Sequence, residues 1–311
     1  MSGIEVATTA WAWDDLGSAA GLCRQAERAE AMGFHSFWLP ENHFGGARAI
    51  PSPLTLLAAV AARTSHLRLG CTSYLLPIRN PLQAAEEVAV LDRLSEGRLI
   101  LGLGRGMQPG MFAAFGVDAA HKRKLFARNL QIMRDAWRGE PLARGEDGRP
   151  VVLAPLPLQQ PAPPLWVAAF GPLALRQVAE LGLPYLASPV ESLQVLQDNY
   201  ALYREAVAAA GLPPVPTVPL MRCVFVAEKP AAARELREAL ARSVPARMRD
   251  KAAAVDDWAI VGDSHYVRER IAEHVARLGV SHLILRGGLE GLDELRQLRS
   301  AEAVLQAVAA L

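Results

Sequence analysis

One segment of the chain, residues 63–106, constrains its fold more than any other. Its two short apolar runs, Leu67–Cys71 and Leu99–Gly104, have the length of buried strands. Between them, Pro81–Leu94 shows the apolar spacing of a helix and begins with an Asn-Pro start signal. Strand, helix and strand make one βαβ unit. Ligands of α/β folds bind at the carboxyl ends of such strands, so we expect a site just after Cys71 and Gly104.

The same alternation extends over the whole chain. Eight strands separated by helices are expected, at Ile4–Thr9, Ser36–Leu39, Leu67–Cys71, Leu99–Gly104, Leu165–Phe170, Tyr185–Ala187, Thr217–Ala227 and His282–Leu285. Eight units in 311 residues, with no shift in composition, favour a single (β/α)8 barrel domain over residues 1–311 rather than an open doubly wound sheet. Gly139–Pro164, rich in Pro and Gly, predicts an insertion before strand five, and the polar segment Val244–Val261 predicts a long lid loop after strand seven.

Charge and composition narrow the classes of partner. The net charge is +1, and no basic stripe or acidic tail is present, so neither nucleic acid nor a membrane surface is an expected partner. The three cysteines form no CxxC pair and no HExxH motif is present, which predicts no metal site. The chain shows no leader-like start and no uninterrupted apolar run of membrane-spanning length, so a cytoplasmic protein is expected.

Two polar clusters lie at predicted strand ends. Arg105 stands between two glycines, where its forked guanidinium suits a phosphate, and Glu86 on the preceding helix could hold it in place. Asn42 and His43 follow the second strand, where a histidine can transfer protons at neutral pH. From the residues alone, the alternative for each cluster is an ordinary solvated side chain.

Several motifs, in order, resemble the bacterial luciferase-like flavin-dependent monooxygenase family. They are Gly33–Phe44, Ala62–Gly70, Asn80–Arg98 and Gly102–Gly106, with weaker matches at Pro157–Pro161, Pro163–Val167 and Ile260–Gly262. The resemblance covers nearly the whole chain and implies a (β/α)8 barrel that binds a flavin across its carboxyl end.

The resemblance also assigns roles to particular residues. It implies a non-prolyl cis peptide between Cys71 and Thr72 under the flavin ring, and Gly104 leaves room beside that ring. Arg105 corresponds to a phosphate-contacting arginine, and Glu86 to an acid near it. The segment Phe170-Gly171, which precedes a predicted helix, would add backbone N–H groups for the phosphate.

Two positions depart from the family pattern. Members close to luciferase carry His-His where this chain has Asn42-His43, and Asn42 cannot shuttle a proton, which leaves His43 as a substitute. After strand five, relatives often have Ser or Thr, whereas this chain has Phe170 and Gly171, so hydroxyl contacts to a phosphate are lost.

The leading hypothesis is a two-component monooxygenase that uses O2 and reduced FMN, supplied by a separate flavin reductase, on a small, mostly apolar substrate. The apolar residues Phe44, Met107, Met111 and Trp258 lie on the loops expected to shape the substrate pocket. The alternatives are hydride transfer with a deazaflavin coenzyme and a non-catalytic flavin-binding protein. By family analogy, a homodimer packed through the second and third helices is expected.

Overall fold

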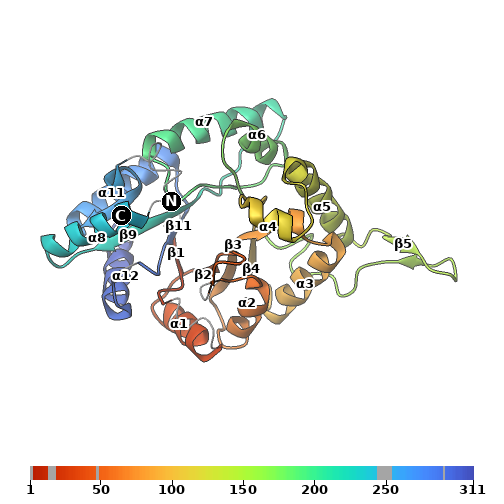
Figure 1. Cartoon of the computed structure of the whole chain (residues 1–311), viewed down its shortest axis with the longest axis horizontal. Coiled ribbons are helices and arrows are strands. Elements are labelled where there is room, and N and C mark those ends of the chain that lie inside the picture. The colour runs from red at the N-terminus through yellow and green to blue at the C-terminus, as the bar shows by residue number, and fades with distance from the viewer. Residues whose placement is uncertain (1–2, 13–18, 47–48, 244–253, 290) are drawn as a thin grey trace. The chain divides into compact units, whose positions relative to one another are not determined.

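The computed structural model describes residues 3–12, 19–46, 49–243, 254–289 and 291–311 (Figure 1). The chain divides into two compact units. Unit 1 comprises Met1–Asp15, Arg28–Phe37 and Ala169–Leu311, and unit 2 comprises Leu16–Glu27 and Trp38–Ala168. The divisions pass through helix α1 (Ala19–Ala31) and strand β2 (Ser36–Leu39).

Unit 1 alternates strands and helices. Its elements are β1 (Glu5–Thr9), α6 (Pro172–Glu180), β8 (Tyr185–Leu186), α7 (Leu193–Ala209), β9 (Pro219–Val226), α8 (Pro230–Ser243), α10 (Val255–Trp258), β10 (Ala259–Gly262), α11 (Ser264–Leu278), β11 (His282–Leu285) and α12 (Glu294–Ala309). Strand β11 lies between β1 and β9, and all the pairings are parallel. Strand β9 pairs with β11 over its first half and with β10 over its second half.

Strand β10 corrects the expected lid. Residues 255–261 are not irregular: α10 forms one helical turn, and the buried run Ala259–Gly262 then pairs with Cys223–Val226 of β9. Burial and pairing against β9 reveal this element. The rest of the expected lid, residues 244–253, lies outside the described residues.

Unit 2 contains the βαβ unit expected from the sequence. Its elements are α2 (Pro53–Ala61), β3 (Arg68–Leu75), η2 (Leu76–Ile78), α3 (Pro81–Leu94), β4 (Leu99–Gly104), α4 (Pro109–Ala114), η3 (Ala119–His121), α5 (Lys122–Trp137), β5 (Ala143–Arg144), β6 (Pro150–Val151) and β7 (Leu165–Ala168). Strand β4 lies between β3 and β7, in parallel with both. An antiparallel hairpin, β5–β6, extends from the chain between α5 and β7 (Figure 1).

Residues of the matched motifs lock the amino ends of β3 and β4. The Arg98 guanidinium donates to Ala61 O, Leu67 O and Thr64 Oγ1, each at 2.9 Å, and to Ser95 O at 2.7 Å. It thereby joins the end of α2, the start of β3 and the turn before β4. Arginine suits this position because its guanidinium presents several donors in one plane, which no other side chain does.

A buried carboxylate completes this lock. Asp92 is fully buried and accepts from Gln159 N at 2.8 Å and from Gln159 Nε2 at 2.6 Å. Gln159 in turn donates to Leu99 O at 2.9 Å and accepts from Arg68 Nη2 at 3.1 Å. The strongest sequence motifs of unit 2 therefore hold its strands in register.

Unit 1 has its own buried polar groups, on β9 and on helix α11. Arg222 is fully buried and donates to Ser188 O at 2.9 Å and to Glu191 O at 2.8 Å. His274 on α11 is 3% exposed, and its Nδ1 lies 2.7 Å from Arg270 O. Burial lowers the pKa of His274 to about 4, with a smaller contribution in the same direction from the charge of Arg222. The native imidazole is therefore neutral at pH 7.

Replacing Arg98 by lysine should destabilise the protein. Lysine keeps the charge but cannot serve four acceptors in one plane, so we expect a loss of about 2 kcal/mol in the free energy of unfolding. Urea denaturation measures it. The matched control is Arg149→Lys, whose side chain is 86% exposed and which should change stability by less than about 0.5 kcal/mol. Equal effects of the two variants would contradict the role given to Arg98.

His274 should make stability fall in mild acid. Below the ordinary histidine pKa of about 6.5 the unfolded chain gains a proton that the native state accepts only near pH 4. Stability is therefore lost as the pH falls through this window. Between pH 7 and 4.5, wild type should lose about 2 kcal/mol more than His274→Gln. His265→Gln, a 69% exposed position on the same helix, should follow wild type.

Candidate functional site

The carboxyl ends of β3 and β4 meet at an irregularity in β3. Cys71 pairs with Leu101 and Tyr74 pairs with Leu103, so Thr72 and Ser73 together oppose Gly102. One extra residue in a strand is a β-bulge, which bends the strand and re-aims its side chains. A non-proline cis peptide lies within it, between Thr72 and Ser73. The expected position, Cys71–Thr72, is wrong by one residue, because Cys71 is still in regular pairing with β4.

The glycines of β4 accommodate this bulge. A Cβ on Gly102 would lie 2.1 Å from Cys71 O, and one on Gly104 would lie 2.4 Å from Ser73 Oγ. Both distances are below any normal contact. The expectation that the missing side chain of Gly104 leaves room beside a flavin is therefore wrong, since Ser73 fills that space.

Arg105 follows β4 directly and is 8% exposed. Its Nη2 donates to Ala168 O at 3.2 Å, and its guanidinium carbon lies 5.2 Å from the centroid of the Phe126 ring. Burial lowers the pKa of Arg105 to about 10, with a further contribution from the charge of Arg123. The side chain remains a cation at neutral pH. Within the described residues no acidic side chain forms an ion pair with it, so a dianion would be a favourable partner.

Glu86 is not brought to Arg105. It lies on the exposed face of α3, and no hydrogen bond or ion pair joins the two among the described residues. Helix spacing explains the difference: Ala85 and Val88 face the core, which turns Glu86 outward. The neighbouring Glu87 instead accepts from Tyr74 Oη at 2.8 Å.

His43 is brought to the end of β3 by Glu41, a residue to which we assigned no role from the sequence. The Glu41 side chain is fully buried, and its Oε2 accepts from Leu75 N at 3.0 Å. Its Oε1 lies 2.7 Å from both His43 Nε2 and Arg79 Nη1. Glu41 belongs to the matched motif after β2, and a carboxylate two residues before a histidine was the available signal. Arg79, which lies before the Asn-Pro helix start, carried no such signal.

Asn42 has a structural contact in this loop. Its Oδ1 accepts from Ile50 N at 2.7 Å, and its own N–H donates to Ile50 O at 3.1 Å. The loop after β2 thus folds back on itself. The bond from Ile50 N holds the Asn42 side chain in this loop.

The apolar residues expected around a substrate divide into two groups. Phe44 and Met107 are exposed, by 70% and 55%, whereas Met111 and Trp258 are buried, at 3% and 1%. Met111 packs with Leu75 because residues 109–114 form α4 rather than the expected loop. The expectation for Met111 and Trp258 is wrong, since both belong to the core.

Phe44 has a backbone conformation that is unusual for its type. Its φ is 58°, in the left-handed region that a residue with a Cβ rarely adopts. Its ring centroid lies 5.9 Å from that of His43 and 6.0 Å from that of Phe115, and the Phe115 ring meets His43 edge-on at 5.0 Å. The two phenylalanines form an aromatic rim beside His43. Strained residues of this kind cluster at functional sites.

The remaining predicted residues, Phe170 and Gly171, lie in unit 1. Phe170 is 46% exposed, and Gly171 is the N-cap of α6 with a φ of 75°, which suits glycine. No side chain caps this helix start. Ala168, which accepts from Arg105, lies three residues before Gly171 in the chain.

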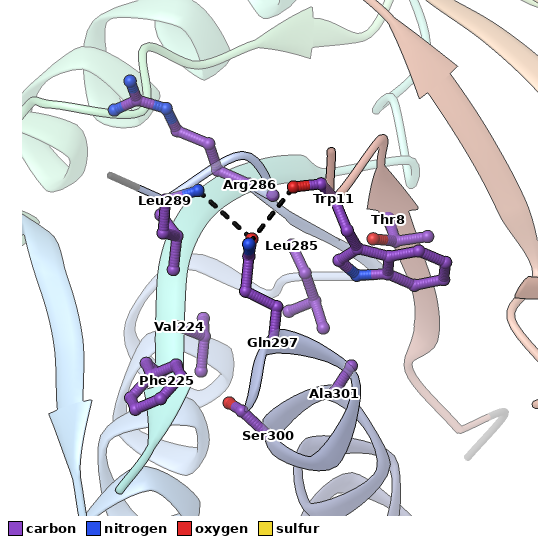
Figure 2. Close-up of a pocket in the computed structure, with 11 residues that line it drawn as sticks. Thr8, Trp11, Val224, Phe225, Leu285, Arg286, Leu289, Gln297, Ser300 and Ala301 are labelled. Carbon is purple, nitrogen blue, oxygen red and sulfur yellow. Dashed lines mark hydrogen bonds between the residues drawn. The ribbon is translucent and has the colours of Figure 1, made fainter. Parts of the chain in front are cut away.

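A small hollow lies in unit 1, at the ends of β1, β9 and β11 (Figure 2). Gln297 of α12 reaches into it, donating to Trp11 O at 3.2 Å and accepting from Leu289 N at 3.1 Å. The Arg286 guanidinium points away from Gln297 (Figure 2). None of the residues expected to form the functional site lines this hollow. Because the side-chain amide of Gln297 bonds to the backbone around this hollow, we interpret the hollow as part of the internal packing of unit 1.

The described residues contain neither a metal-binding cluster nor a membrane-spanning helix. Within the described residues, no three His, Cys, Asp or Glu side chains are grouped so that they could hold a metal ion. Among the described helices, none is both long and apolar enough to cross a membrane.

The family model described as "Luciferase-like monooxygenase" matches residues 1–282. The chain belongs to this family. It is 34% identical over 155 residues to the oxygenase component of the flavin-dependent trigonelline monooxygenase of Acinetobacter baylyi, a match that covers 49% of this chain and 42% of that protein. The chain spans less than half the length of the first curated relatives that it matches.

Solved structures match over the whole chain. The monooxygenase RslO1 of Streptomyces bottropensis has a TM-score of 0.82 at 27% identity, with 99% of both chains covered. The oxygenating constituent of 3,6-diketocamphane monooxygenase of Pseudomonas putida, in complex with FMN, has a TM-score of 0.83 at 21% identity, covering 99% of this chain and 98% of that one. An F420-dependent secondary alcohol dehydrogenase has a TM-score of 0.79 at 17% identity, covering 99% of both. The last two show a shared fold alone.

Replacing Gly104 by alanine should disrupt the end of β4. The new Cβ would meet Ser73 Oγ at 2.4 Å and Ser73 Cβ at 2.9 Å, so we expect a loss of about 1–3 kcal/mol in the free energy of unfolding. Adding Ser73→Gly removes both atoms and should recover part of that loss. Gly110→Ala, where nothing lies within 4 Å of the new Cβ, is the control. An additive double variant would show that the two sites do not touch.

Proposed function

We propose that this protein is a flavin-dependent oxidoreductase, and specifically a monooxygenase that uses reduced FMN and O2. The observation that carries the proposal is Arg105: a buried guanidinium, beside a second positive charge from Arg123, without an acidic partner in the described part of the chain. Such a side chain is costly to bury unless an anion compensates it. The terminal phosphate of FMN is an anion of suitable charge and shape for the guanidinium fork.

The residues that would hold the flavin come from two places. Arg105, in unit 2, would bind the phosphate, and the part expected of Phe170 and Gly171, which lie in unit 1, stays a prediction from the family resemblance. Cys71 and Thr72, where the bulge begins, would support the ring, and Gly104 would offer its backbone, since Ser73 occupies the space of a side chain there. Glu86 has no part in this proposal because it faces away on α3.

When bound, a reduced flavin supplies the electrons that activate O2. The chain's own residues would orient the substrate, exclude water and manage protons. The aromatic rim of Phe44 and Phe115, with exposed Met107, favours a small and mostly apolar substrate. His43, held by Glu41, would exchange a proton or hydrogen bond with the substrate, and Asn42 would shape the loop that presents it.

A separate flavin reductase would supply the reduced FMN. The support is the relative in Acinetobacter baylyi, which is named as the oxygenase component of its enzyme.

Hydride transfer with a deazaflavin is the second candidate. An F420-dependent dehydrogenase shares the fold, and Asn42 replaces the histidine of luciferase-like members. Oxygen uptake separates the two activities, because only the monooxygenase consumes O2 when it is supplied with reduced flavin and substrate. Flavin binding with neither activity over a broad substrate panel would instead indicate a non-catalytic flavin-binding protein.

A homodimer packed through α2 and α3 is part of the proposal. Helix α3 exposes Leu82, Val90 and Leu94, by 37%, 44% and 58%. Their spacing of eight and four residues places them along one helix face. An exposed apolar face of this kind is typical of a protein interface.

Replacing Arg105 by alanine should weaken binding of reduced FMN. Loss of a charge-assisted contact to a phosphate costs about 1.5–3 kcal/mol, which is roughly a 10–100-fold rise in Kd. Anaerobic titration of the wild-type and variant proteins measures it. Arg105→Lys should fall between the two, and Lys124→Ala, an exposed cation on α5, should stay within about 3-fold of wild type. An unchanged Kd for Arg105→Ala would overturn the phosphate site.

A further inference from the structure

The carboxylate of Glu41 has three donors around it and a fixed position. Leu75 N–H occupies Oε2, and Arg79 Nη1 occupies Oε1, at 3.0 and 2.7 Å. Arg79 is itself held, because Nη1 also donates to Leu75 O at 3.1 Å and its guanidinium lies 3.8 Å from the centre of the Tyr74 ring. The Arg79 carbonyl accepts from Asn129 Nδ2 at 3.2 Å. Glu41 therefore cannot turn away without leaving the half-buried Arg79 without its counter-charge and the Leu75 N–H without its acceptor.

His43 meets this carboxylate through one nitrogen. Nε2 lies 2.7 Å from Glu41 Oε1, and Nδ1 forms no hydrogen bond within the described residues. A carboxylate paired with Arg79 offers only acceptor oxygens, so the nitrogen facing it must carry a proton. In the neutral imidazole, the other nitrogen is then an acceptor.

We propose that Glu41 is a positioning residue that fixes His43 as its Nε2–H tautomer and leaves Nδ1 as a hydrogen-bond acceptor toward the substrate. A substrate group held at His43 is then an O–H or N–H donor on an otherwise apolar body, since Phe44 and Phe115 flank the ring. The statement about the substrate rests on the proposed function, whereas the tautomer does not.

The tautomer can be measured without flavin. In the full-length protein with 15N-labelled histidine at pH 8, two-bond 1H–15N spectra distinguish the two neutral tautomers and the imidazolium. The His43→Asn variant assigns the resonance. The expected result is protonated Nε2 and unprotonated Nδ1 for His43. Protonation of Nδ1, alone or together with Nε2, would overturn the proposal.

Glu41→Gln tests the positioning role. The glutamine amide places a donor where Leu75 N–H, Arg79 or His43 Nε2 needs an acceptor, so the population of the Nδ1–H tautomer should rise. Glu87→Gln is the matched control, because it changes a carboxylate that accepts from Tyr74 Oη rather than from His43. It should leave the tautomer of His43 unchanged. An unchanged tautomer in Glu41→Gln would contradict the role. If that variant does not fold, the wild-type spectrum still decides.

The outcome is separable from the flavin proposal. Arg105→Ala should keep the His43 signature of wild type while losing affinity for reduced FMN. A failure of FMN binding with the expected tautomer would reject the cofactor and leave the role of Glu41 intact. Binding of reduced FMN together with the other tautomer would reject the role of Glu41 and leave the proposed cofactor intact.

Discussion

The bulge in β3 is the constraint on which the site in unit 2 depends. Two residues opposite Gly102 push Cys71 O and Ser73 Oγ into the space that side chains on β4 would occupy. At Gly102 a side chain would meet the Cys71 backbone, and at Gly104 it would meet the Ser73 side chain. After the bulge, Leu75 is back in register with Gly104, and its N–H donates to Glu41. The loop that carries His43 is thereby tied to β3, while β4 ends at Arg105.

Two kinds of electrostatic environment coexist in this unit. Glu41 is buried, but Arg79 balances its charge and N–H groups donate to its carboxylate oxygens. Its hydrogen-bonding and charge requirements are therefore met. Arg105 is buried with a carbonyl and an aromatic ring as its described neighbours, so its charge is not matched by a side chain. The environment of Glu41 makes the local structure rigid, whereas that of Arg105 favours the binding of an anion. This difference is the physical reason why we assign a positioning role to Glu41 and a binding role to Arg105.

Sequence reasoning succeeded where periodicity and start signals were strong. The unit from Leu67 to Gly104 was predicted because Asn80 caps α3 through its own side chain and Pro81 begins it. It failed where long-range packing decides the outcome, as in the four-residue strand β10 and the position of the cis bond. Within the site, Arg105 was identifiable from its two glycines. Glu41 had a local signal in the histidine two residues later, whereas Arg79 had none, because it lies 38 residues from Glu41 in the sequence.

The lock formed by Asp92, Arg98 and Gln159 lies at the amino ends of the strands, whereas Arg105 and His43 follow carboxyl ends. Residues of the motifs that carry the family resemblance thus hold the architecture of this unit together. A match that rests on such residues reports how a chain folds rather than what it transforms. Relatives at 34%, 32% and 28% identity are named for substrates as unlike as trigonelline, limonene and alkanals. Sorting such chains by chemistry requires comparing the few positions around His43 and its carboxylate instead.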